Sequence, residues 1–162
     1  MSAEFTANQA IKSQYHAGLS MLQQSIENCP ESLWFDPTAK NKYWQVAFHV
    51  LFYTHLYLQP SESVFVRWPK HRGESQSLGK PESVEPYTQA DMLEYMAFCG
   101  EQVDQQVEVL DLAGESGFSW LPFNKLEVQL YNIRHIMQHT GELSGRLFEQ
   151  EGIEINWVGM ER

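Results

Sequence analysis

Residues 43–61 read YWQVAFHVLFYTHLYLQPS, and no side chain in this stretch carries a full charge at neutral pH. The length approaches that of a membrane-spanning helix. However, five polar side chains interrupt the apolar surface: Gln45, His49, Thr54, His55 and Gln59. Polar groups at this density are costly in lipid, which argues against a membrane span. We therefore expect a helix buried in a protein core, and the rest of the chain must supply its covering.

Two helices are predicted in the first 60 residues. Apolar residues recur every three or four positions from about residue 7 to 28, and a Thr-x-x-Gln capping box precedes them. The uncharged stretch extends backward to give a helix over about 37–59, with Asp36 as its N-cap and Pro37 in its first turn. Both predicted helices are followed directly by a proline-containing turn.

Two more helices are predicted in the second half. Residues 89–112 begin with a Thr-x-x-Asp box and place one apolar face toward the core, made of Met92, Met96, Cys99, Val103, Val107 and Leu110. Residues 125–150 form the fourth helix, with a predicted apolar stripe of Leu126, Leu130, Ile133, Met137 and Phe148. Short β-like runs occur only at 64–66 and 153–158. We expect an all-α four-helix bundle in one domain spanning 1–162, because four amphipathic helices bury their apolar faces against one another.

The connection between the second and third helices, residues 60–87, is longer than most loops in compact domains. It carries the basic side chains Arg67, Lys70, Arg72 and Lys80 in a chain whose formal net charge is −10. Two interpretations stay open at this point. The segment is either a solvated crossover connection or a flap that binds an anionic ligand.

The composition indicates which kinds of binding partner and which cellular compartment to expect. With 11 basic against 21 acidic side chains, the chain repels phosphate backbones, so a nucleic-acid partner is disfavoured. Cys29 and Cys99 form no metal-binding or redox motif, which is typical of a reducing compartment. The first five residues lack the features of a signal peptide. We expect a cytoplasmic protein with a small-molecule substrate and no membrane partner.

Histidines are the candidate chemical residues, because the common phosphate-binding and hydrolase motifs are absent. His135 and His139 leave one face of the fourth helix a turn apart, at a spacing that lets both bind one divalent ion. Six histidines give this spacing by chance roughly one time in six, so two surface histidines are the alternative. The second helix offers His49 or His55 as a third ligand. They point about 120° apart, so one ion takes only one of them, and periodicity does not decide which.

A resemblance to a known family favours one of these two histidines. The segments YWQVAFHVL at 43–51 and IRHIMQHTGEL at 133–143 together resemble the DinB-like (DinB/YfiT) superfamily, and the match in order and spacing covers nearly the whole chain. Members of this superfamily are four-helix bundles that bind a divalent metal through one histidine of the second helix and a late H-x-x-x-H pair. The resemblance implies His49, His135 and His139 as the metal ligands.

Such a ligand set suggests a class of chemistry. Three imidazoles with an open coordination position are typical of catalytic sites, and neutral nitrogen donors suit zinc or nickel rather than calcium or magnesium. Several relatives resemble thiol S-transferases or hydrolases. The resemblance thus implies a metal-activated thiol or water that attacks a small electrophile, with a low-molecular-weight thiol as a second cofactor held by the basic connection. Glu142 either orients a ligand or relays a proton, or it is an ordinary surface glutamate.

A non-catalytic function on the same fold is the alternative. In this interpretation the chain is a metal-binding, stress-associated homodimer that acts as an interaction protein. Trp34, Trp120 and Trp157 lie near predicted helix ends and could build its interface.

Overall fold

The computed structural model describes residues 6–80 and 84–162, and over these residues the chain is all-helical, as predicted. Within the described residues the only β-like feature is an isolated antiparallel bridge between Glu115 and Asn124, so the runs at 64–66 and 153–158 are not strands. Residues 1–5 and 81–83, which include the start examined for a signal peptide and part of the long connection, lie outside the described residues. The elements are α1 (Ala7–Glu27), α2 (Glu31–Trp34), α3 (Tyr43–Tyr57), the short 3-10 helix η1 (Glu62–Val64), α4 (Gln89–Val107) and α5 (Lys125–Glu151).

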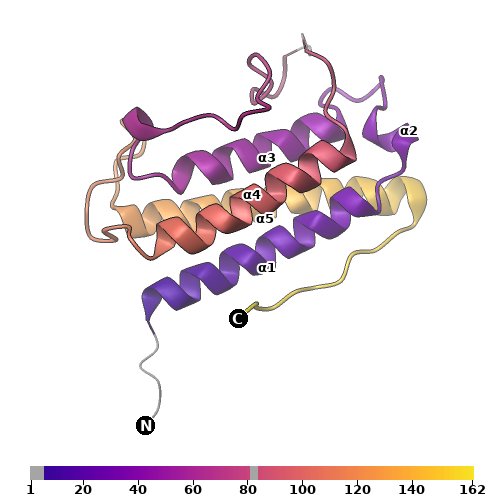
Figure 1. The fold of residues 1–162 in the computed structure, drawn as a ribbon. Coiled ribbons are helices and arrows are strands. Elements are labelled where there is room, and N and C mark those ends of the chain that lie inside the picture. Colours follow the sequence, from indigo (N-terminus) through magenta and orange to yellow (C-terminus); the bar gives the residue numbers. More distant parts are fainter. Residues whose placement is uncertain (1–5, 81–83) are drawn as a thin grey trace.

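The four long helices pack side by side, and each has two neighbours. Helix α1 lies against α4 and α5, and α3 lies against the same two helices. Figure 1 shows that α1 and α5 run in one direction and that α3 and α4 run in the other. Because α3 and α4 are parallel, the chain has to return over the length of α3, about 22 Å, before α4 begins. That return explains the long connection, which crosses above α3 in Figure 1.

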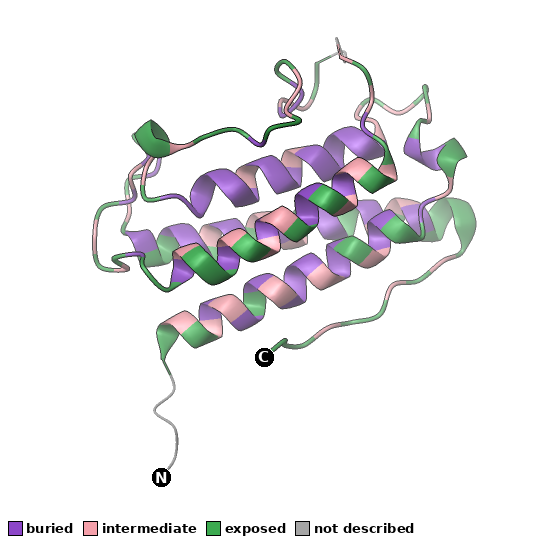
Figure 2. Ribbon diagram, viewed as in Figure 1, coloured by how far each residue is buried: buried purple, intermediate pink, exposed green. Residues whose placement is uncertain are grey.

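Helix α3 is buried on nearly every side, as its uncharged sequence predicts (Figure 2). Helices α4 and α5 pack against it, and the connection crosses over its outer side. None of the helices in the described part of the chain is long and apolar enough to cross a membrane.

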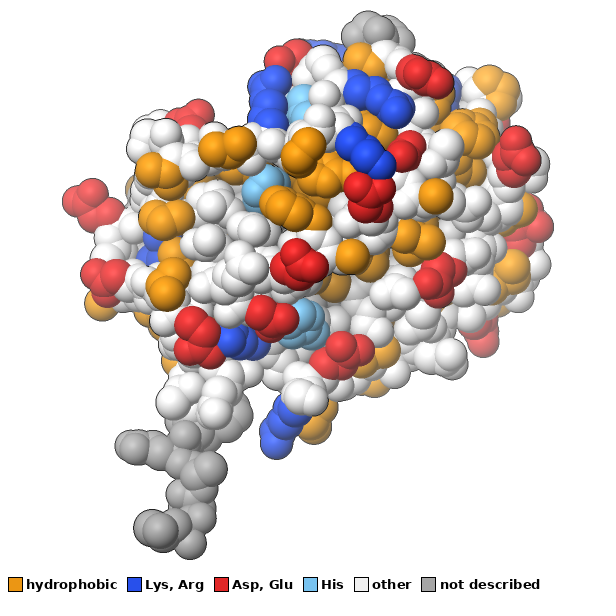
Figure 3. Space-filling view, in the orientation of Figure 1, with side chains coloured by type: hydrophobic (Ala, Val, Ile, Leu, Met, Phe, Trp, Pro, Cys, Tyr) orange, Lys and Arg blue, Asp and Glu red, His pale blue; other side chains and the backbone are white. Residues whose placement is uncertain are grey.

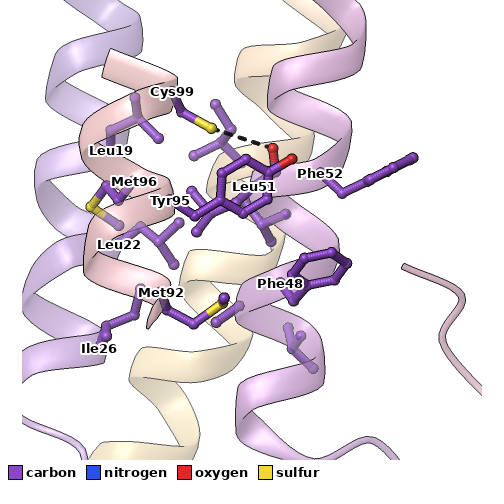
Figure 4. Packing of buried hydrophobic residues seen from close by; sticks show 14 of the residues in the cluster. Leu19, Leu22, Ile26, Phe48, Leu51, Phe52, Met92, Tyr95, Met96 and Cys99 are labelled. Atoms are coloured by element: carbon purple, nitrogen blue, oxygen red, sulfur yellow. Dashed lines mark hydrogen bonds between the residues drawn. The ribbon is translucent and has the colours of Figure 1, made fainter. Parts of the chain in front are cut away.

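The predicted apolar face of α4 is the one that the structure buries. Figure 4 shows Met92, Met96 and Cys99 directed toward α1 and α3, and the thiol of Cys99 donates a long hydrogen bond to the carbonyl of Leu51. The capping boxes at the starts of α1 and α4 form as predicted. The helix is shorter than the predicted 89–112, however. The amide of Leu110 still bonds to the carbonyl of Gln106, and the regular turns end there.

The predicted start of the second helix is wrong. Asp36 does not cap a helix that begins at Pro37; its carboxylate accepts hydrogen bonds from the amide and the hydroxyl of Thr38 and closes a local turn. Asp and Asn often form such turns in competition with helix capping. Helix α3 begins at Tyr43 instead, where the side chain of Gln45 accepts the amide hydrogen of Lys42.

The predicted apolar stripe of α5 is wrong at three of its five members, whereas Ile133 and Met137 are partly buried. Leu126, Leu130 and Phe148 are exposed. The buried face consists of Lys125, Val128, Gln129, Asn132, Ile136, His139, Thr140, Leu143 and Leu147. Gln129 and the Nδ2 group of Asn132 can be buried because they are hydrogen-bonded. The hydroxyl of Tyr15 donates to Oε1 of Gln129 at 2.7 Å, and Nδ2 of Asn132 donates to the same hydroxyl at 3.0 Å. This face brings the histidines of α5 against α3.

Candidate metal centre

Three histidines converge between α3 and α5. One potential ligand atom from each of His49, His135 and His139 can be chosen so that all three lie within 4.8 Å of one another. The Nε2 atoms of His49 and His135 are 3.0 Å apart, and the three ring centroids are separated by 4.8 to 4.9 Å. The histidines named by the family resemblance therefore come together in space.

His55 lies elsewhere in the core. It is 3% exposed, its Nδ1 is 3.2 Å from the hydroxyl of Tyr95, and its ring packs against those of Phe65 and Phe98. Burial lowers the pKa of His55 to about 4, so the ring is neutral at physiological pH. His55 is thus a hydrogen-bonded core residue, and the two histidines of α3 point apart as their spacing predicts.

Hydrogen bonds made by Nδ1 of His49 and by Nδ1 of His139 determine which ring nitrogen carries the proton. Nδ1 of His49 is 2.7 Å from the backbone carbonyl oxygen of Gln76, and a carbonyl can only accept, so this nitrogen carries the hydrogen. Nδ1 of His139 is 2.9 Å from a carboxylate oxygen of Glu142 and carries its hydrogen for the same reason. In a neutral ring the other nitrogen then bears a lone pair. Both lone pairs are on Nε2.

The third imidazole, that of His135, can carry its proton on either ring nitrogen. Its contact with the lone pair on Nε2 of His49 is a hydrogen bond when His135 carries its proton on Nε2. In that form its Nδ1 is a buried acceptor with no partner among the described residues. With the proton on Nδ1, the Nε2 atom of each of the three rings carries a lone pair. A divalent cation fits this donor set, as nitrogens around a tetrahedral ion at about 2.1 Å lie about 3.4 Å apart.

Burial also keeps these rings in the form that binds a metal. The pKa of His49 falls to about 4, mainly through burial and further through the neighbouring His139. The pKa of His135 falls to about 3, again mainly through burial and further through His49 and His139. Both rings are therefore neutral at pH 7, and no proton has to be removed by a competing metal.

The elements around the cluster hold it in place. Glu142 lies one turn after His139 on α5 and binds its Nδ1, so Glu142 orients a candidate ligand, which is one of its predicted roles. The carbonyl that binds His49 belongs to the long connection. Sequence reasoning missed Gln76, because a backbone carbonyl leaves no signature in the side-chain pattern.

The basic residues of the connection are mostly paired with acids. Lys70 forms ion pairs with Glu94 and Asp91 of α4, and Arg72 approaches Asp91 as well as donating to two backbone carbonyls. Arg67 lies 3.4 Å from Glu74. Figure 3 shows basic side chains accompanied by acidic ones on the face in view. These contacts favour a connection tied down to α4 over a flap with free charges for an anion.

The tryptophans differ in their exposure. Trp34 is fully buried and donates from Nε1 to the carbonyl of Tyr87, so it belongs to the core and not to an interface. Trp120 and Trp157 are exposed.

A hollow of about 770 Å³ lies between α1, α4 and the C-terminal segment. Its one histidine, His16, is held by Asp104 at 2.8 Å. We place the candidate site at the three histidines, since three potential ligand atoms within 4.8 Å of one another specify a ligand more closely than volume does. Comparisons with models of known protein families, with curated proteins and with solved structures find no match.

Proposed function

We propose that this chain is a metal-dependent enzyme of the DinB-like type, with a four-helix-bundle fold and a divalent ion held by His49, His135 and His139. One observation carries the proposal. The contacts of Gln76 and Glu142 leave the lone pairs of His49 and His139 on Nε2, and one potential ligand atom from each of the three histidines lies within 4.8 Å of the others. A divalent cation between the three rings would accept these lone pairs. Neutral nitrogen donors favour zinc or nickel as that cation.

Three protein ligands are the number found at catalytic metal sites, where a fourth position takes water or substrate. When bound, the ion supplies Lewis acidity that lowers the pKa of a coordinated water or thiol toward neutrality. The protein's own contribution is orientation: the carbonyl of Gln76 and the carboxylate of Glu142 hold the imidazoles by their outer nitrogens. Because Glu142 is engaged in this way, we assign it as a positioning residue and not as a general base.

The reaction proposed is attack of a thiol or water on a small electrophile. The test compares zinc-loaded, nickel-loaded and chelator-treated protein, each without a histidine tag. Cysteine and glutathione are offered with 1-chloro-2,4-dinitrobenzene, and water is offered with p-nitrophenyl acetate. We expect turnover that requires metal and that His139→Ala abolishes. His16→Ala is the matched control, since His16 is a histidine on α1 outside the cluster.

A different outcome would favour the non-catalytic interpretation. If bound metal raises the melting temperature but no combination of thiol, water and electrophile turns over above the chelated control, catalysis is refuted and metal binding alone remains.

A further inference from the structure

The metal centre is the end of a longer row of rings. On α3 the aromatic side chains recur every four residues, and on α5 a matching series runs in the opposite direction. The two series, which we call the aromatic ladder, are His49, Tyr53 and Tyr57 on α3 and His139, His135 and Tyr131 on α5. Because α3 and α5 are antiparallel neighbours, the series pair ring against ring. Centroid distances are 4.8 Å for His49–His139, 5.7 Å for Tyr53–His135 and 5.6 Å for Tyr57–Tyr131.

Tyr53 is the member that adjoins the candidate ligands. Its ring centroid is 4.9 Å from that of His49 and 5.7 Å from that of His135. The ring of Phe52 meets it edge-on at 5.1 Å and limits its movement. Tyr53 is only partly buried, whereas Tyr57 is buried and its hydroxyl accepts a hydrogen bond from Nε1 of Trp120. A rigid aromatic surface thus borders both the histidines and solvent.

The surroundings of the Tyr53 ring are aromatic. Within the described residues its ring packs against those of His49, Phe52, Tyr57 and His135. An aromatic ligand can bury its faces against such a surface and stack on it.

We propose that the aromatic ladder binds the organic part of the ligand, and that this part is a planar aromatic group attached close to the atom that binds the metal. The inference rests on the proposed function, because it takes the ion at the three histidines as its anchor. Tyr53 and Tyr131 supply the ring faces, and the guanidinium of Arg134 lies over the Tyr131 ring at 5.5 Å. Stacking and burial of one phenyl ring correspond to roughly a tenfold or greater gain in affinity over a methyl group.

Two hydroxamates test the proposed aromatic site, because they share one metal-binding group and differ only in the attached substituent, phenyl or methyl. Untagged protein is loaded with Co²⁺, whose visible absorption reports a ligand at the ion, and is titrated with benzohydroxamate and with acetohydroxamate. We expect benzohydroxamate to bind at least about tenfold more tightly. In Tyr53→Ala the preference should fall to about twofold, with Co²⁺ binding and acetohydroxamate affinity unchanged. Tyr131→Ala removes the other ring face and serves as a second variant if Tyr53→Ala does not fold.

Two controls make the result specific. Tyr53→Phe should retain the preference, because the ring face and not the hydroxyl carries it. Trp157→Ala removes an exposed aromatic ring in the C-terminal segment and should change nothing. Equal affinities for the two hydroxamates, or a preference that survives both alanine variants, would overturn the inference while leaving the metal centre intact. Failure of the wild-type protein to bind Co²⁺ would overturn the proposed function and this inference together.

Discussion

Replacing Glu142 by alanine tests whether the outer hydrogen bonds prepare the histidines for a metal. The carboxylate of Glu142 accepts from Nδ1 of His139 at 2.9 Å and so keeps the lone pair on Nε2. In Glu142→Ala the ring is free to place its proton on either nitrogen and to rotate. Loss of such an outer partner typically weakens metal binding 10- to 100-fold.

The structure places the expected effect at the lower end of that range. The side chain of Glu142 is 39% exposed, against 11% for His139, so water can take over part of the lost hydrogen bond. We therefore expect about a tenfold weaker affinity for Zn²⁺. The assay is competition with a chromophoric chelator at pH 7.5, where the wild-type and variant proteins are titrated against the same indicator.

Glu149→Ala is the matched control, since Glu149 is an exposed glutamate two turns further along α5. Its zinc affinity should equal that of the wild-type protein. Glu142→Gln keeps an acceptor without the charge and should fall between the two. If Glu142→Ala binds zinc as tightly as Glu149→Ala, the assignment of Glu142 as a positioning residue is wrong.

Two further predictions concern stability. Burial lowers the pKa of His55 to about 4 in the folded protein, from about 6.5 in the unfolded chain. Above pH 6.5 the ring is neutral in both states. As the pH falls from 6.5 toward 4, the unfolded chain takes up the proton first, so the free energy of unfolding falls by about 3 kcal/mol. Urea unfolding of metal-free protein at pH 7 and 4.5 should show a smaller loss for His55→Phe than for the wild type, and equal losses would contradict the assignment. Lys125 is buried and donates to the carbonyls of Gln59, Pro60 and Ser116. Lys125→Met should lower the free energy of unfolding by about 2–4 kcal/mol, because those acceptors lose their donor; an unchanged urea midpoint would show that water replaces it.

Much of the fold was predictable because local signals agreed with tertiary packing. The uncharged stretch of α3 became the most buried helix, and the boxes at Thr6 and Thr88 set two helix starts. One predicted boundary was wrong because two local signals competed. Asp36 has the side chain of an N-cap but closes a turn with Thr38.

The prediction of the buried face of α5 was wrong for a different reason. Counting apolar residues cannot recognise that Gln129 and Asn132 face the core, because their burial depends on Tyr15, more than a hundred residues earlier in the chain. The same limit applies to the site. Spacing identified the pair on α5, but the choice of His49 over His55 came from a family resemblance, and the contact with Gln76 depends on where the long connection crosses α3.

The central claim is that His49, His135 and His139 share one divalent ion. Elemental analysis of untagged protein, dialysed against trace zinc and nickel, tests it directly. We predict one equivalent of metal in the wild-type protein and in His16→Ala, and less than about a tenth of an equivalent in His49→Ala, because two remaining imidazoles do not retain an ion through dialysis. Full occupancy in His49→Ala, with the protein folded, would contradict the claim.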